Sequence, residues 1–304
     1  MINISVVINT INEEENLPKA LSSIRNLADE IVVVDMRSTD RTVAIAKEAG
    51  AKVYEHKRTG YVEPARNFAI SKAHGKYVLI LDADEEIPSS LAKKLKQLSL
   101  KNEADYYRIP RKNIIFGKWM KHSGWWPDFN IRFFKKGSVV WNEVIHSVPM
   151  TQGKGVDLQA EEKLAIVHNN YKSIEDYLER MNRYTTVQSE LKIADGYKFI
   201  WKDLIDKSLS EFLSRYFAGE GYKDGLHGLS AALLQSFSEA IMFLKIWQKE
   251  KFIEQSITLE EIESQLGKAS KQTNWWVLGE RLKSENIIKA FFAKIRRRTL
   301  KNYE

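Results

Sequence analysis

The sequence predicts an α/β fold, with a Rossmann-like, mostly parallel sheet over the first part of the chain and a mainly α-helical extension after it. Two observations support this prediction. Short β-branched apolar runs alternate with stretches of helical spacing through the first hundred residues, and helical spacing alone continues from about residue 173. With 304 residues, 43% of them hydrophobic, the chain can bury a sizeable core. We therefore expect three regions, residues 1–100, 101–172 and 173–304.

Four strands are expected in the first region, because each apolar run is short and nearly continuous, as in a strand that is covered on both faces. The strand segments are ISVVINT, EIVVVD, AKVYEH and KYVLILDAD. The segments with helical spacing between them are NLPKALSSIRNL, TDRTVAIAKEAG and EPARNFAISKAHG. This alternation is typical of right-handed βαβ units.

Polar residues lie at the ends of these strands. The carboxyl ends of parallel strands meet at one edge of the sheet, and ligands of such folds bind beyond that edge. The rule places Thr10, Asn12, Asp35 and the Asp82–Asp84 pair along one rim. We therefore expect a ligand site at this edge.

The motif LDADEE, residues 81–86, sets four acidic side chains directly behind an apolar strand. Like charges at this spacing repel, so they either lie in water or share a cation. The first hundred residues contain no G-x-G-x-x-G and no G-x-x-x-x-G-K-[ST], which excludes a dinucleotide fingerprint and a P-loop there. Without these phosphate-binding motifs, a divalent cation that bridges a diphosphate to carboxylates could hold the phosphates. Because the chain has no cysteine, oxygen or imidazole must hold such a metal.

Residues 101–172 follow a different pattern. Two aromatic and basic segments, YYRIPRKN and NIRFFKKG, read as strands that flank the loop FGKWMKHSGWWPD. The loop contains Trp119, Trp125 and Trp126, which cluster beside Gly and Pro and follow no buried period. We expect these rings at a ligand-binding site and not in the core.

Three motifs of the first region together resemble family 2 of the inverting glycosyltransferases, which have the GT-A nucleotide-diphospho-sugar transferase fold. They are SVVINTINEEENL, EIVVVDMRSTDRT and ARNFAISKAHGKYVLILDADEEI. The resemblance covers residue 3 to about residue 250, and it implies that residues 1–100 bind the nucleotide sugar while residues 101–172 bind the acceptor.

Three later motifs resemble the subgroup that adds glucose to the inner-core heptose of lipopolysaccharide. They are RKNIIFGKWMKHSGWWPDFNIRFF, YKSIEDYLERMNRYT and GYKDGLHGL. This resemblance implies a nucleotide-diphosphate hexose as donor, UDP-linked in preference to GDP-linked, and a lipid-anchored saccharide as acceptor.

The family resemblance implies roles for the rim residues. Asp35 would accept a hydrogen bond from the nucleotide base, and Thr10 with Asn12 or Glu13 would line the nucleotide pocket. Arg66 would approach the base or the diphosphate. Two alternatives stay open, because Asp35 could cap the following helix and Arg66 could pair with a nearby glutamate on the protein surface.

The acidic motif would hold the metal. The resemblance implies that Asp82 faces the ribose and a divalent Mn²⁺ or Mg²⁺ ion, and that Asp84 ligates this ion. A metal and an arginine can stabilise the charge that develops on a departing nucleoside diphosphate. We expect Glu85 and Glu86 to lie in the first turn of the next helix, whose dipole favours anions.

The catalytic base is harder to assign. An inverting transfer needs a carboxylate that takes the proton of the acceptor hydroxyl. The resembled subgroup has a His-Glu pair after the aromatic loop, but Ser147 stands in place of the glutamate. The candidates are Asp128, whose pKa the neighbouring tryptophans would raise by desolvation, and Glu143, which could instead pair with Arg132.

The expected acceptor-binding residues are Trp125, Trp126, Arg132 and His146. Tryptophan rings can stack on sugars, and His146 could bind phosphate or complete the metal shell. His168 is a second imidazole with the same options. Both histidines could equally be structural.

The C-terminal segment 281–304 carries eight Lys or Arg against two Glu, so it holds +6 of the net charge of +7. Its NIIKAFFAKIRRR stretch has the pattern of a helix in a membrane interface, although a helix packed on the rest of the protein is the alternative. The apolar window Leu229–Trp247 contains Gln235, Glu239 and Lys245, so we expect no transmembrane helix there. With no signal-peptide pattern at the N-terminus, we expect a cytoplasmic protein on the inner face of the membrane.

Two rival functions stay open. A polyprenyl-phosphate sugar transferase would need less of a base, and Lys118, Lys121 or Arg132 could bind its phosphate acceptor. A non-catalytic module could keep the fold and bind RNA or a partner through the basic tail. We favour the glycosyltransferase and expect no nucleic-acid partner, because the acidic motif is intact.

Overall fold

The computed structural model describes all residues except 1, 59–62, 142–148, 284–290, 292–293 and 297–304. The chain forms two compact units. The first, which we call the α/β unit, comprises residues 1–119 and 125–170. The second, the helical unit, comprises residues 120–124 and 171–304.

The first half of the sheet in the α/β unit is parallel, as predicted. Strand β1 (Ile4–Thr10) pairs with β2 (Glu30–Asp35) and β4 (Tyr77–Asp82), and β2 pairs with β3 (Lys52–Glu55). Every residue of β1 is buried, which matches its unbroken apolar sequence. The connecting helices are α1 (Leu17–Ile24), α2 (Thr42–Glu48) and α3 (Glu63–Lys72).

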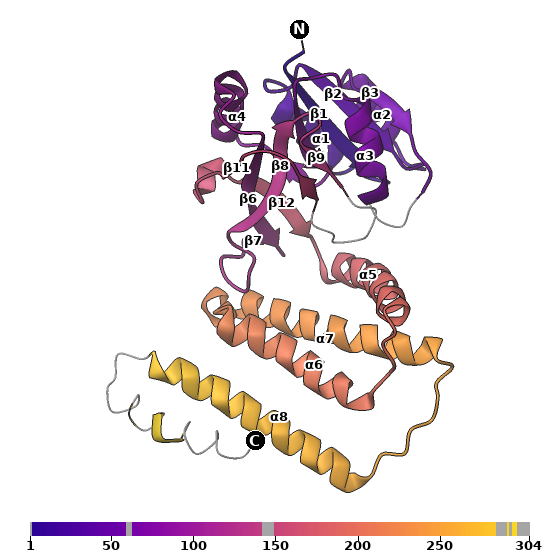
Figure 1. Ribbon diagram of the computed structural model, residues 1–304, viewed down its shortest axis with the longest axis vertical. Coiled ribbons are helices and arrows are strands. Elements are labelled where there is room, and N and C mark those ends of the chain that lie inside the picture. Colours follow the sequence, from indigo (N-terminus) through magenta and orange to yellow (C-terminus); the bar gives the residue numbers. More distant parts are fainter. Residues whose placement is uncertain (1, 59–62, 142–148, 284–290, 292–293, 297–304) are drawn as a thin grey trace. The chain divides into compact units, whose positions relative to one another are not determined.

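The second half of the sheet is antiparallel. Strand β8 (Asp128–Lys135) joins β4, and β6 (Tyr106–Ile115) joins β8, so the order is β3-β2-β1-β4-β8-β6-β12-β5. The shorter strands are β5 (Glu85–Glu86), β7 (Lys118–Trp119), β9 (Val139–Val140), β10 (Met150–Thr151), β11 (Gly155–Asp157) and β12 (Ile166–Tyr171). The predicted α/β fold with a helical C-terminal part is confirmed (Figure 1).

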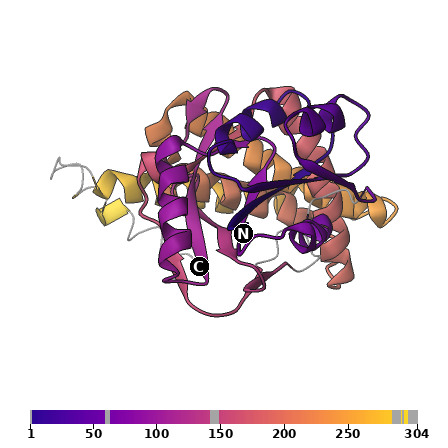
Figure 2. The same ribbon diagram turned by 90° about the horizontal axis from the view of Figure 1, so that it is seen from above.

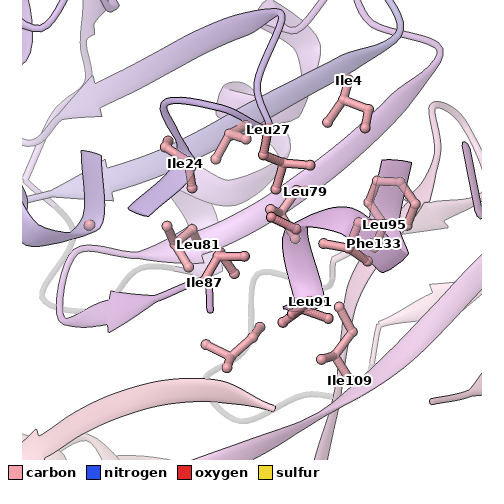
Figure 3. Packing of buried hydrophobic residues seen from close by; sticks show 14 of the residues in the cluster. Ile4, Ile24, Leu27, Leu79, Leu81, Ile87, Leu91, Leu95, Ile109 and Phe133 are labelled. Atoms are coloured by element: carbon pink, nitrogen blue, oxygen red, sulfur yellow. The ribbon is translucent and has the colours of Figure 1, made fainter. Parts of the chain in front are cut away.

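The helices cover both faces of this sheet. Helices α1 and α4 (Ser89–Lys101) lie on one face and α3 lies on the other (Figure 2). Side chains of β1 alternate between two cores: Val6 and Ile8 pack with α1 and α4, whereas Val7 packs with α3. Figure 3 shows the larger core, where Leu79 and Leu81 of β4 lie among side chains of the helices. A strand buried on both faces explains why its sequence shows no polar alternation.

The expected helical position of Glu85 and Glu86 is wrong. Both residues form β5, opposite His168 and Val167 of β12, and α4 begins only at Ser89. Pro88 explains the delay, because the residue before a proline is disfavoured in the α region. No pattern in the sequence around Glu85 indicates that β5 pairs with β12, which lies far away along the chain.

The helical unit consists of α5 (Ile174–Ala194), α6 (Trp201–Leu213), α7 (Leu226–Lys249) and α8 (Leu259–Leu282). A π-helical turn (Ser214–Ala218) and a 3₁₀ turn (Gly221–Asp224) connect α6 to α7. The Ser173 hydroxyl caps α5, and Thr258 with Glu261 forms a capping box on α8. The small core of the helical unit contains Phe199, Met242, Phe243 and Ile246.

Helix α7 combines length with apolar character. Among the residues that the structure describes, it is the one helix long and apolar enough to cross a membrane, by length and composition alone. It contacts α5 and α6 within the helical unit, and 28% of its most apolar window is buried there. The absence of a transmembrane helix therefore stays a prediction.

Candidate active site

The carboxyl ends of β1, β2 and β4 meet at one edge, as the sequence predicted. Thr10 lies opposite Asp35, and Asn9 lies opposite Asp82. The buried Asp35 carboxylate accepts from the Thr10 hydroxyl at 3.2 Å and from the Ser38 amide at 2.9 Å. Asp35 does not cap α2, because the residue before that helix is Arg41.

The loops after β1 and β2 are joined by hydrogen bonds. The Asn12 side-chain oxygen accepts from the Thr39 amide at 2.8 Å, and the Asn12 amide donates to the Ser38 hydroxyl at 2.8 Å. The Glu13 amide donates to the Thr42 hydroxyl at 2.7 Å. Asn12 has a φ of 53°, a conformation that asparagine tolerates better than most residues. That Asn12 and Glu13 line a nucleotide pocket stays a prediction.

Arginines neutralise the first acidic residue of the DADEE motif. The Asp82 carboxylate accepts from Arg66 at 3.0 Å and from Arg132 at 2.6 Å. Burial alone would raise the pKa of Asp82, but the charges of Arg132 and Arg66 outweigh it and hold this pKa well below its ordinary value. The repulsion within the motif is therefore relieved at Asp82 by guanidinium groups.

Glu85 fixes the turn of the motif. Its side chain is fully buried, and one carboxylate oxygen accepts from the Asp82 amide at 2.9 Å. The other accepts from Arg132 at 2.7 Å and lies 3.5 Å from Arg111. Arg132 thus joins Asp82 to Glu85, and only 4% of its side chain is exposed. The predicted role of Arg132 in acceptor binding does not fit this buried position.

Asp84 faces an imidazole. The His168 Nε2 atom lies 3.6 Å from an Asp84 oxygen, and His168 Nδ1 lies 2.6 Å from the side-chain oxygen of Asn113. The Asn113 amide group donates to the Trp125 carbonyl and to Asp128, so its oxygen must face His168 and accept from Nδ1–H. In the neutral imidazole, the Nε2 lone pair then points at a carboxylate. The two groups could therefore share a cation.

The Asp84–His168 pair fits a divalent metal. An oxygen ligand and an imidazole whose other nitrogen is fixed by a hydrogen bond are a usual donor set. Within the described ranges, no group of three or more His, Asp or Glu side chains could hold a metal. Other ligands would therefore have to come from substrate or water. Asp82, predicted as the second ligand, accepts from an arginine at each of its oxygens, and its role as a metal ligand stays a prediction.

Asp128, the first candidate base, is held by an arginine and two amides. It accepts from Arg111 Nε at 2.8 Å, from Asn113 at 3.1 Å and from Asn130 at 2.9 Å. Burial acts to raise the pKa of Asp128, but Arg111 and the two amides outweigh it and lower this pKa. The expected upward shift is therefore wrong, because the site that excludes water from the carboxylate also supplies a paired cation.

One tryptophan of the loop, Trp125, is linked to this carboxylate through Asn113. The Trp125 carbonyl accepts from Asn113, which also binds Asp128. The Trp126 ring meets the Trp119 ring edge to face, with centroids 5.1 Å apart. All three residues are partly exposed, and their role in acceptor binding stays a prediction.

The remaining predicted residues, Glu143 and His146, lie outside the described residues, as does Ser147. Sequence reasoning missed two others, Arg111 and Asn113. A signal for them existed: they alternate on β6, and Asp128, Asn130 and Arg132 alternate on β8. Polar residues at every second position predict one polar face on each strand.

The fold and the rim define a class of protein: a transferase of the GT-A type, with an acidic motif at the carboxyl end of the fourth strand. Residues 5–152 match the family model described as glycosyl transferase family 2. Residues 5–152 therefore carry a family 2 glycosyltransferase domain, and the chain is a glycosyltransferase.

Relatives extend the match beyond those residues. An uncharacterized glycosyltransferase of Rickettsia typhi is 29% identical over 252 residues, which cover 80% of this chain and 86% of that protein. The lipopolysaccharide core biosynthesis glycosyltransferase LpsC of Rhizobium meliloti is 24% identical, over 81% of this chain and 92% of LpsC. Among solved structures, S. aureus TarS in complex with UDP matches with 16% identity and a TM-score of 0.46, covering 84% of this chain and 94% of TarS.

Proposed function

We propose that this glycosyltransferase moves a hexose, with glucose as the first choice, from a UDP-sugar to a lipid-anchored saccharide such as the lipopolysaccharide core, with inversion and with help from a divalent metal. The arrangement of Asp84, His168 and Asn113 at the carboxyl edge of the sheet supports the metal-assisted chemistry. The likeness to LpsC over most of both chains supports the acceptor class.

The donor would lie along the rim. The Asp35 carboxylate, at the end of β2, is the acceptor proposed for the nucleotide base, with Thr10 beside it. Asp84 and His168 would hold Mn²⁺ or Mg²⁺, which supplies positive charge to the leaving diphosphate. Arg66, bound to Asp82 at 3.0 Å, would add a fixed guanidinium next to that charge.

The base would be a carboxylate on the acceptor side. Asp128 lies ionised beside the loop tryptophans, but its bond to Arg111 reduces its basicity. Glu143 stays the second candidate. Variants of both residues are therefore needed to assign the proton acceptor, and the pH dependence of transfer is the measurement that separates them.

Contact with a membrane surface would bring the enzyme to a lipid-anchored acceptor. Four apolar side chains of α7 are exposed and recur at helical spacing: Leu226, Leu233, Phe237 and Leu244. Phe291 and Ile295, in the described part of the basic tail, are exposed as well. These surfaces support a peripheral position on the inner face of the cell membrane.

The polyprenyl-phosphate alternative has less support. It requires basic side chains at the acceptor pocket, and Arg132 is occupied by the carboxylates of Asp82 and the buried Glu85. A saccharide acceptor needs partly exposed aromatic rings, which the loop provides. The family match also favours an enzyme over a non-catalytic module.

Calorimetric titration tests the proposal. The protein is titrated with UDP and with GDP, each with and without Mn²⁺, and Asp84→Ala and His168→Ala are compared with Asp157→Ala, a control in an exposed ion pair of the same unit. We expect UDP to bind with Mn²⁺, both site variants to lose the metal-dependent part, and the control to bind as the parent does. Binding of neither nucleotide under any condition would remove the donor proposal.

A further inference from the structure

Residues Met120–Gly124 lie in the middle of the tryptophan loop but belong to the helical unit. The segment before them ends at Trp119, and the segment after them begins at Trp125, both in the α/β unit. The backbone of these five residues is therefore held by partners other than those of its flanks. Asp224, at the end of the 3₁₀ turn, is the first of these partners.

Asp224 binds the loop through three donors. Its buried carboxylate accepts from the Lys121 amide at 3.1 Å, from the His122 amide at 2.9 Å and from His122 Nδ1 at 3.1 Å. Hydrogen bonds from amides to a buried carboxylate are stronger than those between neutral groups. One side chain thus fixes two consecutive peptide groups of the loop.

Ser123 provides the second attachment. Its amide donates to the Gly219 carbonyl at 2.6 Å, its hydroxyl donates to the Arg215 carbonyl at 3.0 Å, and Arg215 donates back to the Ser123 carbonyl at 3.1 Å. Ser123 is buried, with a φ of 59°. The left-handed conformation of a non-glycine residue persists where its surroundings impose it.

Glycines make this close approach possible. A Cβ atom added to Gly219 would lie 2.8 Å from the Ser123 Cα atom, and one added to Gly221 would lie 2.3 Å from the Ser123 hydroxyl oxygen. A Cβ atom on Gly228 would meet the Gly221 carbonyl oxygen. The GYKDGLHGL motif therefore has glycine where the loop and the turn need space.

We propose that Asp224 is a positioning residue for the acceptor side of the active site: by holding Met120–Gly124, it fixes through the covalent chain where Trp125, Trp126 and Asp128 lie. This inference rests on the proposed function for the identity of the acceptor. The attachment of the loop does not depend on it.

The first test uses hydrogen exchange measured by mass spectrometry on the full chain without ligands. In Asp224→Ala, we expect faster exchange at Lys121 and His122 and also at Trp125–Asp128, with β4 unchanged. Asp224→Asn should restore most of the protection, because an amide oxygen can still accept from both backbone amides. Asp195→Ala, at an exposed position of the same unit, is the control. Unchanged exchange at Trp125–Asp128 in Asp224→Ala would overturn the proposal.

The second test uses kinetics with UDP-glucose as donor and lipopolysaccharide core oligosaccharide as acceptor. Because small misplacements of catalytic groups are costly, kcat/KM for the acceptor should fall about 10- to 100-fold in Asp224→Ala. The KM for UDP-glucose and its hydrolysis without acceptor should not change. Equal losses on the donor and acceptor sides would overturn the positioning role. If the parent transfers nothing to this acceptor, the proposed function fails, and the exchange experiment decides the positioning role alone.

Discussion

Replacing Arg132 by Met tests the origin of stability at the acidic motif. The change removes the side chain that binds Asp82 at 2.6 Å and Glu85 at 2.7 Å, and it leaves the fully buried Glu85 with Arg111 at 3.5 Å. Removing one partner of a buried ion pair costs about 3–5 kcal/mol. For a unit of this size, each kcal/mol lowers Tm by about 2–4 °C, so we expect a decrease of about 6–20 °C, measured by scanning calorimetry at pH 7.

The pH dependence gives a second check on the same variant. In the parent, the pKa of Asp82 is depressed, so its ionised form contributes stability above the ordinary pKa of an aspartate and loses that contribution as pH falls through the lowered value. In Arg132→Met this pKa rises, and less of the contribution remains at pH 7. The difference in Tm between parent and variant should therefore stay nearly constant from pH 7 to pH 5 and shrink as pH falls below the ordinary aspartate pKa of about 3.9. A loss of under 1 kcal/mol, or a difference independent of pH, would refute this reasoning.

Three further predictions concern the site and the surface. Asn113→Leu should weaken Mn²⁺-dependent UDP binding about 10- to 100-fold, because it removes the acceptor that orients His168; calorimetry measures it, and unchanged affinity would contradict the metal pair. Arg111→Gln should raise the lowered pKa of Asp128, so the acid limb of the pH profile for transfer should move to higher pH if Asp128 is the base; an unmoved limb would point to Glu143. Phe237→Ser should reduce co-sedimentation with anionic lipid vesicles, whereas Ser208→Ala in the same unit should not.

Much of the sheet could be predicted because its signals are local. The β-branched runs of β1, β2 and β4 are buried on both faces and therefore appear as unbroken apolar segments. The carboxyl ends of parallel strands meet at one edge of the sheet, where ligands bind. This rule predicted that Thr10, Asp35 and Asp82 lie at one edge, as they do.

The partners across the antiparallel half could not be predicted in the same way. Asp128 and Arg111 meet because β6 pairs with β8. Glu85 lies in a strand and not in the expected helix, because β5 pairs with β12. Neither register follows from local spacing. We expected the tryptophans beside Asp128 in the sequence to raise its pKa by desolvation. The guanidinium of Arg111, on another strand, lowers this pKa instead.

The division of the tryptophan loop between the two units has a consequence for recombination. The chain passes between units at residues 119/120, 124/125 and 170/171. A chimera that exchanges only the C-terminal part of two relatives would combine a new Gly219–Gly228 turn with an old loop. Exchange of residues 120–124 together with residues 171–304 keeps donors, acceptors and glycines matched. We therefore expect these two stretches to behave as one inherited module, although the 46 residues 125–170 of the α/β unit separate them in the sequence.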